Sequence, residues 1–193
     1  MTLFLIGLAA YLIGNISFSL ILSKLVYKKD VRKYGSGNAG TTNMIRAFGF
    51  KIGILTFIGD ALKGMLAAFM GYKFGGTNGL YIAGIMVIVG HNWPVFLKFK
   101  GGKGVATTIG VMLYVLFWPT LVCLIIGIGL AFVTRIVSIG SLIGICLSSL
   151  YVLIFYKPFD ITLLMFTLVY TAMCLFKHRA NIERLIKGEE KKL

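Results

Sequence analysis

The chain has 193 residues, of which 58% are hydrophobic, and its mean hydropathy is +0.91. An ordinary soluble domain is only about half apolar, so this composition excludes that class. Lys and Arg number 20 against 6 Asp and Glu, which gives a formal net charge of +14. Because the basic residues lie in short segments between apolar runs, they indicate membrane orientation, anionic lipid or an anionic substrate rather than nucleic acid.

The apolar runs are continuous rather than alternating, which predicts membrane helices and not a β-barrel. We therefore expect an all-α polytopic membrane protein with about seven transmembrane helices and a single domain over residues 1–193. Several runs are short for a hydrocarbon core of about 30 Å at about 1.5 Å per residue, so we expect some loops to dip inward. The predicted spans are 3–26, 52–72, 80–97, 105–118, 121–134, 138–156 and 161–176.

The first residues, "MTLFLIGLAAYLIG", lack the basic start of a cleaved signal peptide and are predicted to be a retained helix. With the N-terminus outside, the outer loops hold little more than Lys73 and Lys157, and the other loop cations lie inside. The positive-inside rule therefore predicts an external N-terminus and a cytoplasmic C-terminus. This orientation places three unusual polar stretches on the cytoplasmic face.

The first polar stretch is "KYGSGNAGTTNMIRAFG", residues 33–49. It contains a GxGxxG pattern, but membrane helices flank it instead of a strand and a helix, so we reject a dinucleotide fold. A glycine-rich run exposes backbone N–H groups that suit an anion. The alternative is a tight turn followed by a Thr or Asn helix cap. The polar side chains that accompany the glycines are Ser36, Asn38, Thr41, Thr42, Asn43 and Arg46.

The second polar stretch is "GHNWPVFLKFKGGKGVAT", residues 90–107. Lys103 is followed by Gly104 rather than by Ser or Thr, so this is not a Walker loop. If 105–118 is a helix, its N-terminus directs free N–H groups and a favourable dipole at this loop, where Lys103 adds a positive charge. The alternative is a positive-inside anchor with turn glycines.

The third polar stretch is the tail "KHRANIERLIKGEEKKL", residues 177–193. Apolar residues at helical spacing predict an amphipathic interfacial helix that carries His178 and Asn181 on one face. The alternative is a basic stop signal that lipid attracts. The spacing of His178 and Glu183 is similar to the HxxxxD dyad of other acyltransferases, but Glu replaces Asp and the match carries little weight.

Three other features lie inside the apolar runs. Asp60 and Lys63 are spaced to share a helix face, which indicates either a functional site or a mutually neutralising pair. Small residues at Gly140, Gly144 and Ser148 predict close helix packing. The chain has three cysteines without CxxC spacing, and we expect them to be inert: Cys123, Cys146 and Cys174.

With "SGNAGTTN", "GDALKG", "GHNWPVFLKFKGGKGVAT" and "KHRANIERLIKGEE" in this order, nearly the whole chain resembles the bacterial acyl-phosphate-dependent glycerol-3-phosphate acyltransferases (the PlsY family). The resemblance implies acyl transfer from acyl phosphate to the sn-1 hydroxyl of glycerol 3-phosphate, giving 1-acylglycerol 3-phosphate (lysophosphatidic acid) and phosphate. This reaction is the first step of bacterial phospholipid synthesis, at the cytoplasmic (inner) membrane. The implied partners are glycerol 3-phosphate, long-chain acyl phosphate, membrane lipid and the enzyme that makes acyl phosphate, with no cofactor and no metal.

The resemblance and the chemistry of the three stretches together assign the site. The residues predicted to be catalytic are His178, Lys103, Ser36 and Asn181. The residues predicted to bind substrate are Gly37, Asn38, Gly40, Thr41, Asn43, Arg46, Asp60, Lys63, His91, Gly101, Gly102, Gly104 and Arg179. Positioning and electrostatic stabilisation suffice for an activated acyl donor, so we expect direct attack, with His178 or a donor phosphate oxygen taking the proton.

Two other functions stay open on the sequence. A transporter or channel for a small anion would carry polar residues into mid-bilayer, and Asn15, Ser17 and Ser19 in the first predicted span fit that pattern. A membrane acyltransferase that uses acyl-CoA is the second alternative, although no separate nucleotide-binding region is visible.

Overall fold

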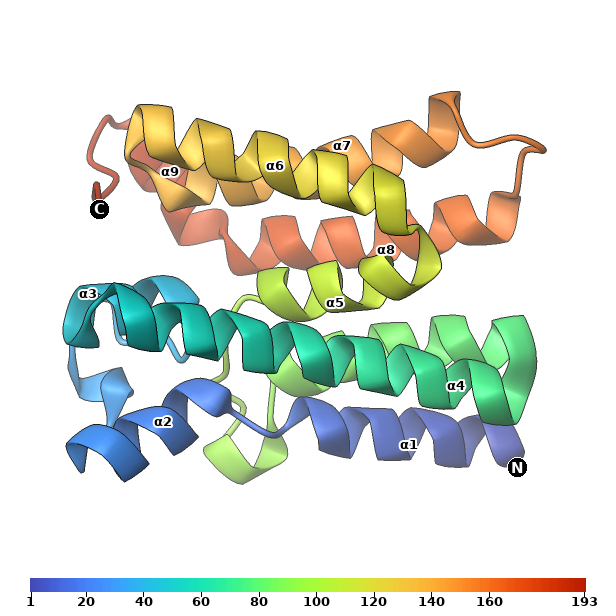
Figure 1. Cartoon of the computed structure of the whole chain (residues 1–193), viewed down its shortest axis with the longest axis horizontal. Helices are drawn as coiled ribbons and strands as arrows, with labels where there is room; N and C mark the ends of the chain where they lie inside the picture. The colour runs from blue at the N-terminus through green and yellow to red at the C-terminus, as the bar shows by residue number, and fades with distance from the viewer. The chain divides into compact units, whose positions relative to one another are not determined.

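The computed structural model describes all residues, 1–193, as helices and loops without a strand (Figure 1). The predicted all-α class is confirmed. The chain forms two compact units, Met1–Val115 and Leu116–Leu193, which are described in turn. That the chain is one functional domain stays a prediction.

The first unit holds five α-helices and two short 3₁₀ helices. In order, the elements are α1 (Thr2–Gly14), α2 (Phe18–Tyr27), η1 (Val31–Lys33), α3 (Thr41–Phe48), α4 (Phe50–Asn92), η2 (Val95–Leu97) and α5 (Val105–Val115).

Helix α4 reverses direction at Gly76, whose φ of 59° and ψ of −152° suit glycine and almost no other residue. A Cβ atom at Gly71 would lie 2.5 Å from the carbonyl oxygen of Gly79, so the backbones on either side of the turn touch. In Figure 1 the teal first half of α4 is followed by a green second half that runs back along it. The two halves correspond to the predicted spans 52–72 and 80–97.

The first predicted span, 3–26, is broken into α1 and α2 at Asn15–Ser17. A break inside a membrane leaves backbone groups that need partners. The Lys63 ammonium of α4 donates to the carbonyl oxygens of Gly14, at 3.2 Å, and Ile16, at 2.6 Å. The sequence pattern missed this break because a side chain distant in the sequence stabilises it.

Small residues let the helices of the first unit approach closely. A Cβ atom at Gly14 of α1 would lie 2.9 Å from the Cα of Gly90, in the second half of α4. A Cβ atom at Gly110 of α5 would overlap the carbonyl oxygen of Ala61, in the first half of α4. Such backbone contact is typical of membrane helix interfaces. It holds α1 and α5 closely against α4.

The second unit contains α6 (Phe117–Thr134), α7 (Val137–Ile154), α8 (Ile161–Lys177) and α9 (Arg179–Ile186). A Cβ atom at Gly140 of α7 would overlap the carbonyl oxygen of Gly127 in α6, which confirms the predicted close packing. Ser148 faces α8 instead, where its hydroxyl lies 2.6 Å from the Tyr170 hydroxyl. Helices α8 and α9 meet at an angle of 62°.

Four segments are long and apolar enough to cross a membrane, and a fifth is added if the bent pair α8–α9 is one span. The four are Thr2–Tyr27, Phe50–Leu97, Phe117–Thr134 and Val137–Ile154, of which the second contains the reversal at Gly76. Helix α5 is apolar but short. The multi-pass membrane character is confirmed, whereas the count of about seven spans and the orientation stay predictions.

Candidate functional site

The first glycine-rich loop is built around the side chain of Asn43. Its Oδ1 accepts a hydrogen bond from the Ser36 backbone N–H at 2.8 Å. Its Nδ2 lies 3.0–3.1 Å from the carbonyl oxygens of Val31, Tyr34 and Asn38. Asn43 was predicted to bind substrate, but its buried amide is occupied in shaping the loop, so its contribution to a site is to hold the backbone that surrounds it.

Two glycines in this loop adopt positive φ angles, 58° at Gly35 and 72° at Gly37. A Cβ atom at Gly35 would also overlap the Asn43 Oδ1. Helix α3 begins at Thr41 directly after the loop, but its N-cap is Gly40 and no side chain caps it, so the Thr or Asn cap of the alternative interpretation is wrong. The first loop therefore ends at a helix N-terminus, whose N–H groups and dipole favour an anion.

The second glycine-rich loop, Gly101–Gly104, ends where α5 begins, and it packs on the C-terminal end of α4. The Gly102 N–H donates to the His91 carbonyl oxygen at 3.1 Å. A Cβ atom at Gly101 would overlap that same oxygen. Gly104 has a φ of 83°, and a Cβ there would lie 2.8 Å from the Asn92 Oδ1. Glycine is thus required at 101 by close backbone approach, and at 104 by the positive φ and the neighbouring Asn92 side chain.

The two glycine-rich loops meet at Gly102. A Cβ atom at Gly102 would lie 3.0 Å from the carbonyl oxygen of Ala39 in the first loop, and it would overlap the Nε2 of His91. Arg46 lies in the last turn of α3, and the half-buried Lys103 precedes α5. This arrangement suits phosphate groups, because it combines the N-termini of α3 and α5 with the cations Arg46 and Lys103 and with the loop backbone.

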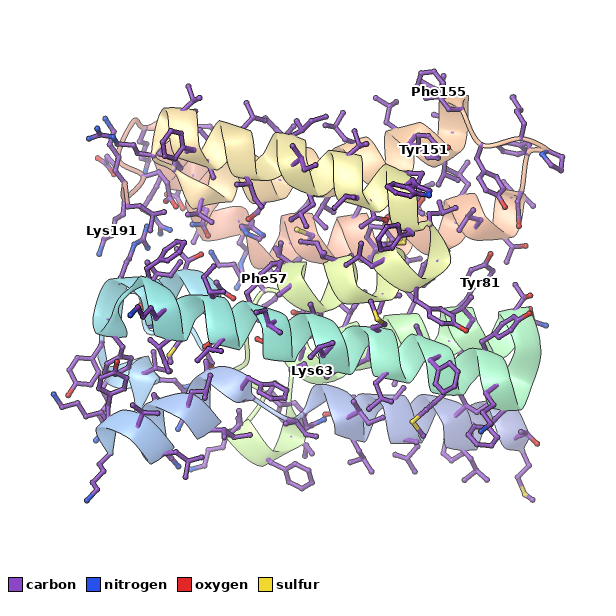
Figure 2. All side chains as sticks on the ribbon, viewed as in Figure 1. Phe57, Lys63, Tyr81, Tyr151, Phe155 and Lys191 are labelled. Atoms are coloured by element: carbon purple, nitrogen blue, oxygen red, sulfur yellow. The ribbon has the colours of Figure 1, made fainter.

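Asp60, Lys63 and His91 form a buried charged cluster in α4, with Lys63 midway along its first half (Figure 2). The Lys63 Nζ lies 2.7 Å from the Asp60 Oδ1 and 2.9 Å from the His91 Nδ1. Asp60 and Lys63 expose only 1% and 4% of their surface. The sequence predicted that both bind substrate, which stays a prediction; the structure shows the two side chains paired with each other.

The cluster fixes the protonation of His91. The Lys63 amine is surrounded by a carboxylate and two carbonyl oxygens, which favour the ammonium form. An ammonium has no lone pair, so the His91 Nδ1 accepts from it at 2.9 Å, whereas the Asp60 Oδ1 lies 3.6 Å from the same nitrogen, beyond hydrogen-bond distance. A neutral imidazole with an accepting Nδ1 carries its proton on Nε2. The Nε2–H of His91 is therefore a donor at the Gly102 side of the imidazole.

In the second unit, His178 lies at the junction of α8 and α9 and is 3% exposed. Its Nδ1 lies 2.9 Å from the carbonyl oxygen of Cys174. A carbonyl can only accept, so Nδ1–H donates and Nε2 is left as the basic nitrogen. This tautomer suits a proton acceptor. Glu183 pairs with Lys187 at 2.8 Å on the surface.

Asn181 is held by Glu190, a residue that the sequence analysis missed. The Asn181 Nδ2 donates to the Glu190 Oε1 at 2.5 Å, the Ser138 hydroxyl donates to the same oxygen at 3.0 Å, and the Arg184 Nε donates to Oε2 at 2.7 Å. Burial raises the pKa of Glu190, but the hydrogen bonds from Asn181, Arg184 and Ser138 outweigh it and lower that pKa. The available signal was the pair of adjacent acids, Glu189 and Glu190, in the basic "GEEKKL" segment.

The remaining predicted residue of the tail, Arg179, is exposed. Its guanidinium donates to the Phe176 carbonyl oxygen at 3.1 Å and lies 4.6 Å from the Phe176 ring centroid. Among the predicted site residues, His178, Arg179 and Asn181 belong to the second unit, and the others belong to the first. No group of three or more His, Cys, Asp or Glu side chains is placed to hold a metal ion.

Residues 4–188 match the glycerol-3-phosphate acyltransferase family. The chain is 44% identical over 191 residues to a glycerol-3-phosphate acyltransferase of Finegoldia magna, with 99% of this chain and 96% of the relative covered. It is 45% identical over 189 residues to the enzyme of the same name from Thermoanaerobacter pseudethanolicus, with 98% and 94% covered.

Among solved structures, the fold is similar to that of PlsY (YgiH), described as an integral membrane glycerol 3-phosphate acyltransferase. Its glycerol 3-phosphate form matches with a TM-score of 0.93 and 35% identity, over 100% of this chain and 96% of that one. Its lysophosphatidic acid form matches with a TM-score of 0.91 and 34% identity over the same shares. The similarity extends over the full length in sequence and in structure, and the chain belongs to the glycerol-3-phosphate acyltransferase (PlsY) family of integral membrane acyltransferases.

Proposed function

We propose that this chain transfers a fatty acyl group from acyl phosphate to the sn-1 hydroxyl of glycerol 3-phosphate. The products are 1-acylglycerol 3-phosphate and inorganic phosphate. Family membership supports the acyltransferase activity, and the forms in which the similar PlsY was solved support this acceptor and this product. One observation in this chain supports the proposed reaction best: the two glycine-rich loops meet at Gly102, close to the N-termini of α3 and α5.

The donor proposal follows from the chemistry of those loops. An acyl phosphate carries its anionic group directly beside the carbonyl carbon that reacts. Backbone N–H groups and a helix N-terminus that hold this phosphate also align the carbonyl for attack. A thioester has no phosphate at that position, so the glycine-rich loops would give no such alignment. We therefore infer acyl phosphate rather than acyl-CoA as the donor.

In the proposed reaction the glycerol hydroxyl oxygen attacks the acyl carbonyl, and the bond from that carbon to the phosphate oxygen breaks. The hydroxyl proton passes to the His178 Nε2 or to a phosphate oxygen of the donor, and phosphate leaves. No acyl-enzyme forms, since a mixed anhydride is already activated. Lys103, Arg46 and the loop N–H groups stabilise the negative charge that develops, and Ser36 and Asn181 are proposed to contact the reacting groups.

The transporter alternative rested on polar residues in the first span. In the structure the break at Asn15–Ser17 is occupied by the Lys63 ammonium, which binds the Gly14 and Ile16 carbonyl oxygens. This polar region therefore has a structural occupant. We retain the orientation from the charge pattern as part of the proposal: external N-terminus, and loops on the cytoplasmic face of the bacterial inner membrane, where the enzyme that makes acyl phosphate would supply the donor.

The experiment that tests the proposal uses purified protein, labelled glycerol 3-phosphate and two donors. We expect turnover with palmitoyl phosphate, none above background with palmitoyl-CoA, and inhibition by a non-hydrolysable acyl phosphonate that is competitive with the donor. Equal turnover with palmitoyl-CoA, or an acyl phosphonate that fails to compete, would overturn the donor assignment.

A further inference from the structure

The charged cluster of Asp60, Lys63 and His91 has no part in the reaction proposed above. Charged groups inside a membrane helix are costly and are retained where they serve a function. Removing one partner of a buried ion pair is strongly destabilising, whereas replacing both by apolar residues is often neutral. A cluster that only balanced its own charge would therefore be dispensable as a unit.

The contacts of Lys63 show that the cluster does more than balance charge. Its ammonium forms an ion pair with the Asp60 carboxylate at 2.7 Å and hydrogen-bonds to three further groups within 3.2 Å: the carbonyl oxygens of Gly14 and Ile16, and the His91 Nδ1. These three groups lie outside the Asp60–Lys63 pair. Lys63 thus links the break between α1 and α2 to the end of α4 that carries His91.

His91 in turn packs on Gly102 of the second glycine-rich loop, the residue at which that loop meets the first. Its carbonyl oxygen accepts the Gly102 N–H at 3.1 Å, and its Nε2 edge packs so closely on Gly102 that a Cβ there would overlap it. The Ala39 carbonyl oxygen of the first loop lies 3.0 Å from the same Cβ position. The one imidazole N–H that Lys63 leaves protonated is therefore directed at the place where the two loops meet.

We propose that Asp60 and Lys63 are positioning residues, which hold His91 as its Nε2–H tautomer so that His91 keeps the two glycine-rich loops in their phosphate-binding arrangement. The phosphate-binding part rests on the proposed function. All the contacts that carry the proposal lie within the first unit. The proposal differs from the sequence-based assignment, in which these three side chains bind substrate themselves.

The first test compares Lys63→Met with the double variant Asp60→Asn/Lys63→Met. We expect the single variant to lose stability, because a buried carboxylate is left without its cation. The double variant removes that charge and should fold, with a melting temperature between those of Lys63→Met and the unmodified protein, because the Gly14 and Ile16 carbonyl oxygens still lose the lysine. Its kcat/KM for glycerol 3-phosphate or for palmitoyl phosphate should still fall between about tenfold and 10²-fold, the cost of a misplaced binding group. Unchanged kinetics for both substrates in the folded double variant would overturn the proposal.

The second test does not depend on the double variant folding. A glutamine amide nitrogen can occupy the place of the His91 Nε2, whereas an asparagine amide reaches only the place of Nδ1. If the Nε2–H is the donor that matters, His91→Gln should retain at least about tenfold more activity than His91→Asn, a difference of about 1.4 kcal/mol. Equal loss in the two variants, or better activity with Asn, contradicts the proposal.

The two tests are separable from the proposed function. The unmodified protein is first assayed with palmitoyl phosphate and with palmitoyl-CoA, which decides the donor. If only the other donor reacts, the proposed donor fails, but the order of His91→Gln and His91→Asn measured with that donor still decides whether His91 positions the loops through its Nε2–H.

Discussion

The two units each bury one histidine near the end of a membrane helix, and the two side chains have opposite surroundings. In the first unit the His91 Nδ1 faces the Lys63 ammonium and accepts. In the second unit the His178 Nδ1 faces the Cys174 carbonyl oxygen and donates. His91 is therefore left with a donor on Nε2, and His178 with a base. On our proposals, the same residue type serves loop geometry in one unit and proton transfer in the other, and the partner of Nδ1 decides which.

The units also differ in how their charged groups are held. Asp60 of the first unit is neutralised within α4, by a lysine one helical turn away. Glu190 of the second unit comes from the tail after α9 and binds Asn181, Arg184 and Ser138. The Asp60 charge is thus balanced by a residue of the same membrane helix, whereas the Glu190 contacts depend on a tail outside the membrane helices. We therefore expect the second unit to respond to pH and to changes in the tail.

The largest effect should come from His178→Ala. If the imidazole takes the proton, the rate should fall about 10²- to 10⁴-fold, and the decline of activity at low pH should disappear because the base that it reports is gone. Both are measured as pH–rate profiles with palmitoyl phosphate. A small loss with an unchanged profile would show that the donor phosphate takes the proton, and the comparison of the two histidines would lose its functional meaning.

Lys103→Ala should have the next largest effect. The second loop would lose its positive charge beside the N-terminus of α5, at a cost of about 3–4 kcal/mol if the contact strengthens in the transition state. The control is Lys100→Ala, an exposed cation three positions earlier in the same loop, which should leave turnover nearly unchanged. Equal activity of the two variants would reduce the loop to a membrane anchor.

Gly102→Ala tests the contact between the loops and His91. The added methyl group would overlap the His91 Nε2, and we expect a loss of about 1–3 kcal/mol from overpacking, together with weaker substrate binding. Thermal unfolding and KM measure these separately. Gly129→Ala is the matched control, since a Cβ at Gly129 meets nothing within 4 Å. Similar results for both glycines would mean that the loop is not packed as described.

Glu190→Gln should give a smaller effect that depends on pH. The folded-state pKa of Glu190 lies below its ordinary value, so its stabilisation is present above the pKa of the unfolded chain and is lost as pH falls through the folded-state pKa. At neutral pH we expect the variant to lose roughly 1–3 kcal/mol, the range for hydrogen bonds to a charged group. The gap between the two proteins should close in acid, and a constant gap in thermal unfolding from neutral to acidic pH would be the contrary result.

Much of the fold was predictable because continuous apolar runs leave few alternatives. The predicted spans 138–156 and 161–176 agree with α7 and α8 to within two residues at every end. The errors have physical causes. The first span breaks because the Lys63 ammonium donates to the carbonyl oxygens that the break frees. Helix α4 ends at Asn92 because Pro94 disfavours helical backbone angles at Trp93, the residue before it.

The candidate site was predictable as a set of stretches but not as a set of roles. Glycines and basic residues marked both loops, since glycine indicates close backbone approach and Lys or Arg indicates positive charge. The role of Asn43 was not, because its amide bonds to backbone groups up to twelve positions away. Glu190 was missed for the same reason: its partners Ser138 and Asn181 come together only in the folded unit.

The most direct test of the account is nitrogen NMR of the imidazole rings at neutral to mildly alkaline pH. The chain has only two histidines, and a second sample of His178→Ala assigns the signals of ¹⁵N-labelled protein. Protonated and unprotonated ring nitrogens have well-separated shifts, so each tautomer can be read directly. The account predicts a proton on Nε2 of His91 and on Nδ1 of His178. The same tautomer at both histidines, or the reverse assignment, would contradict it.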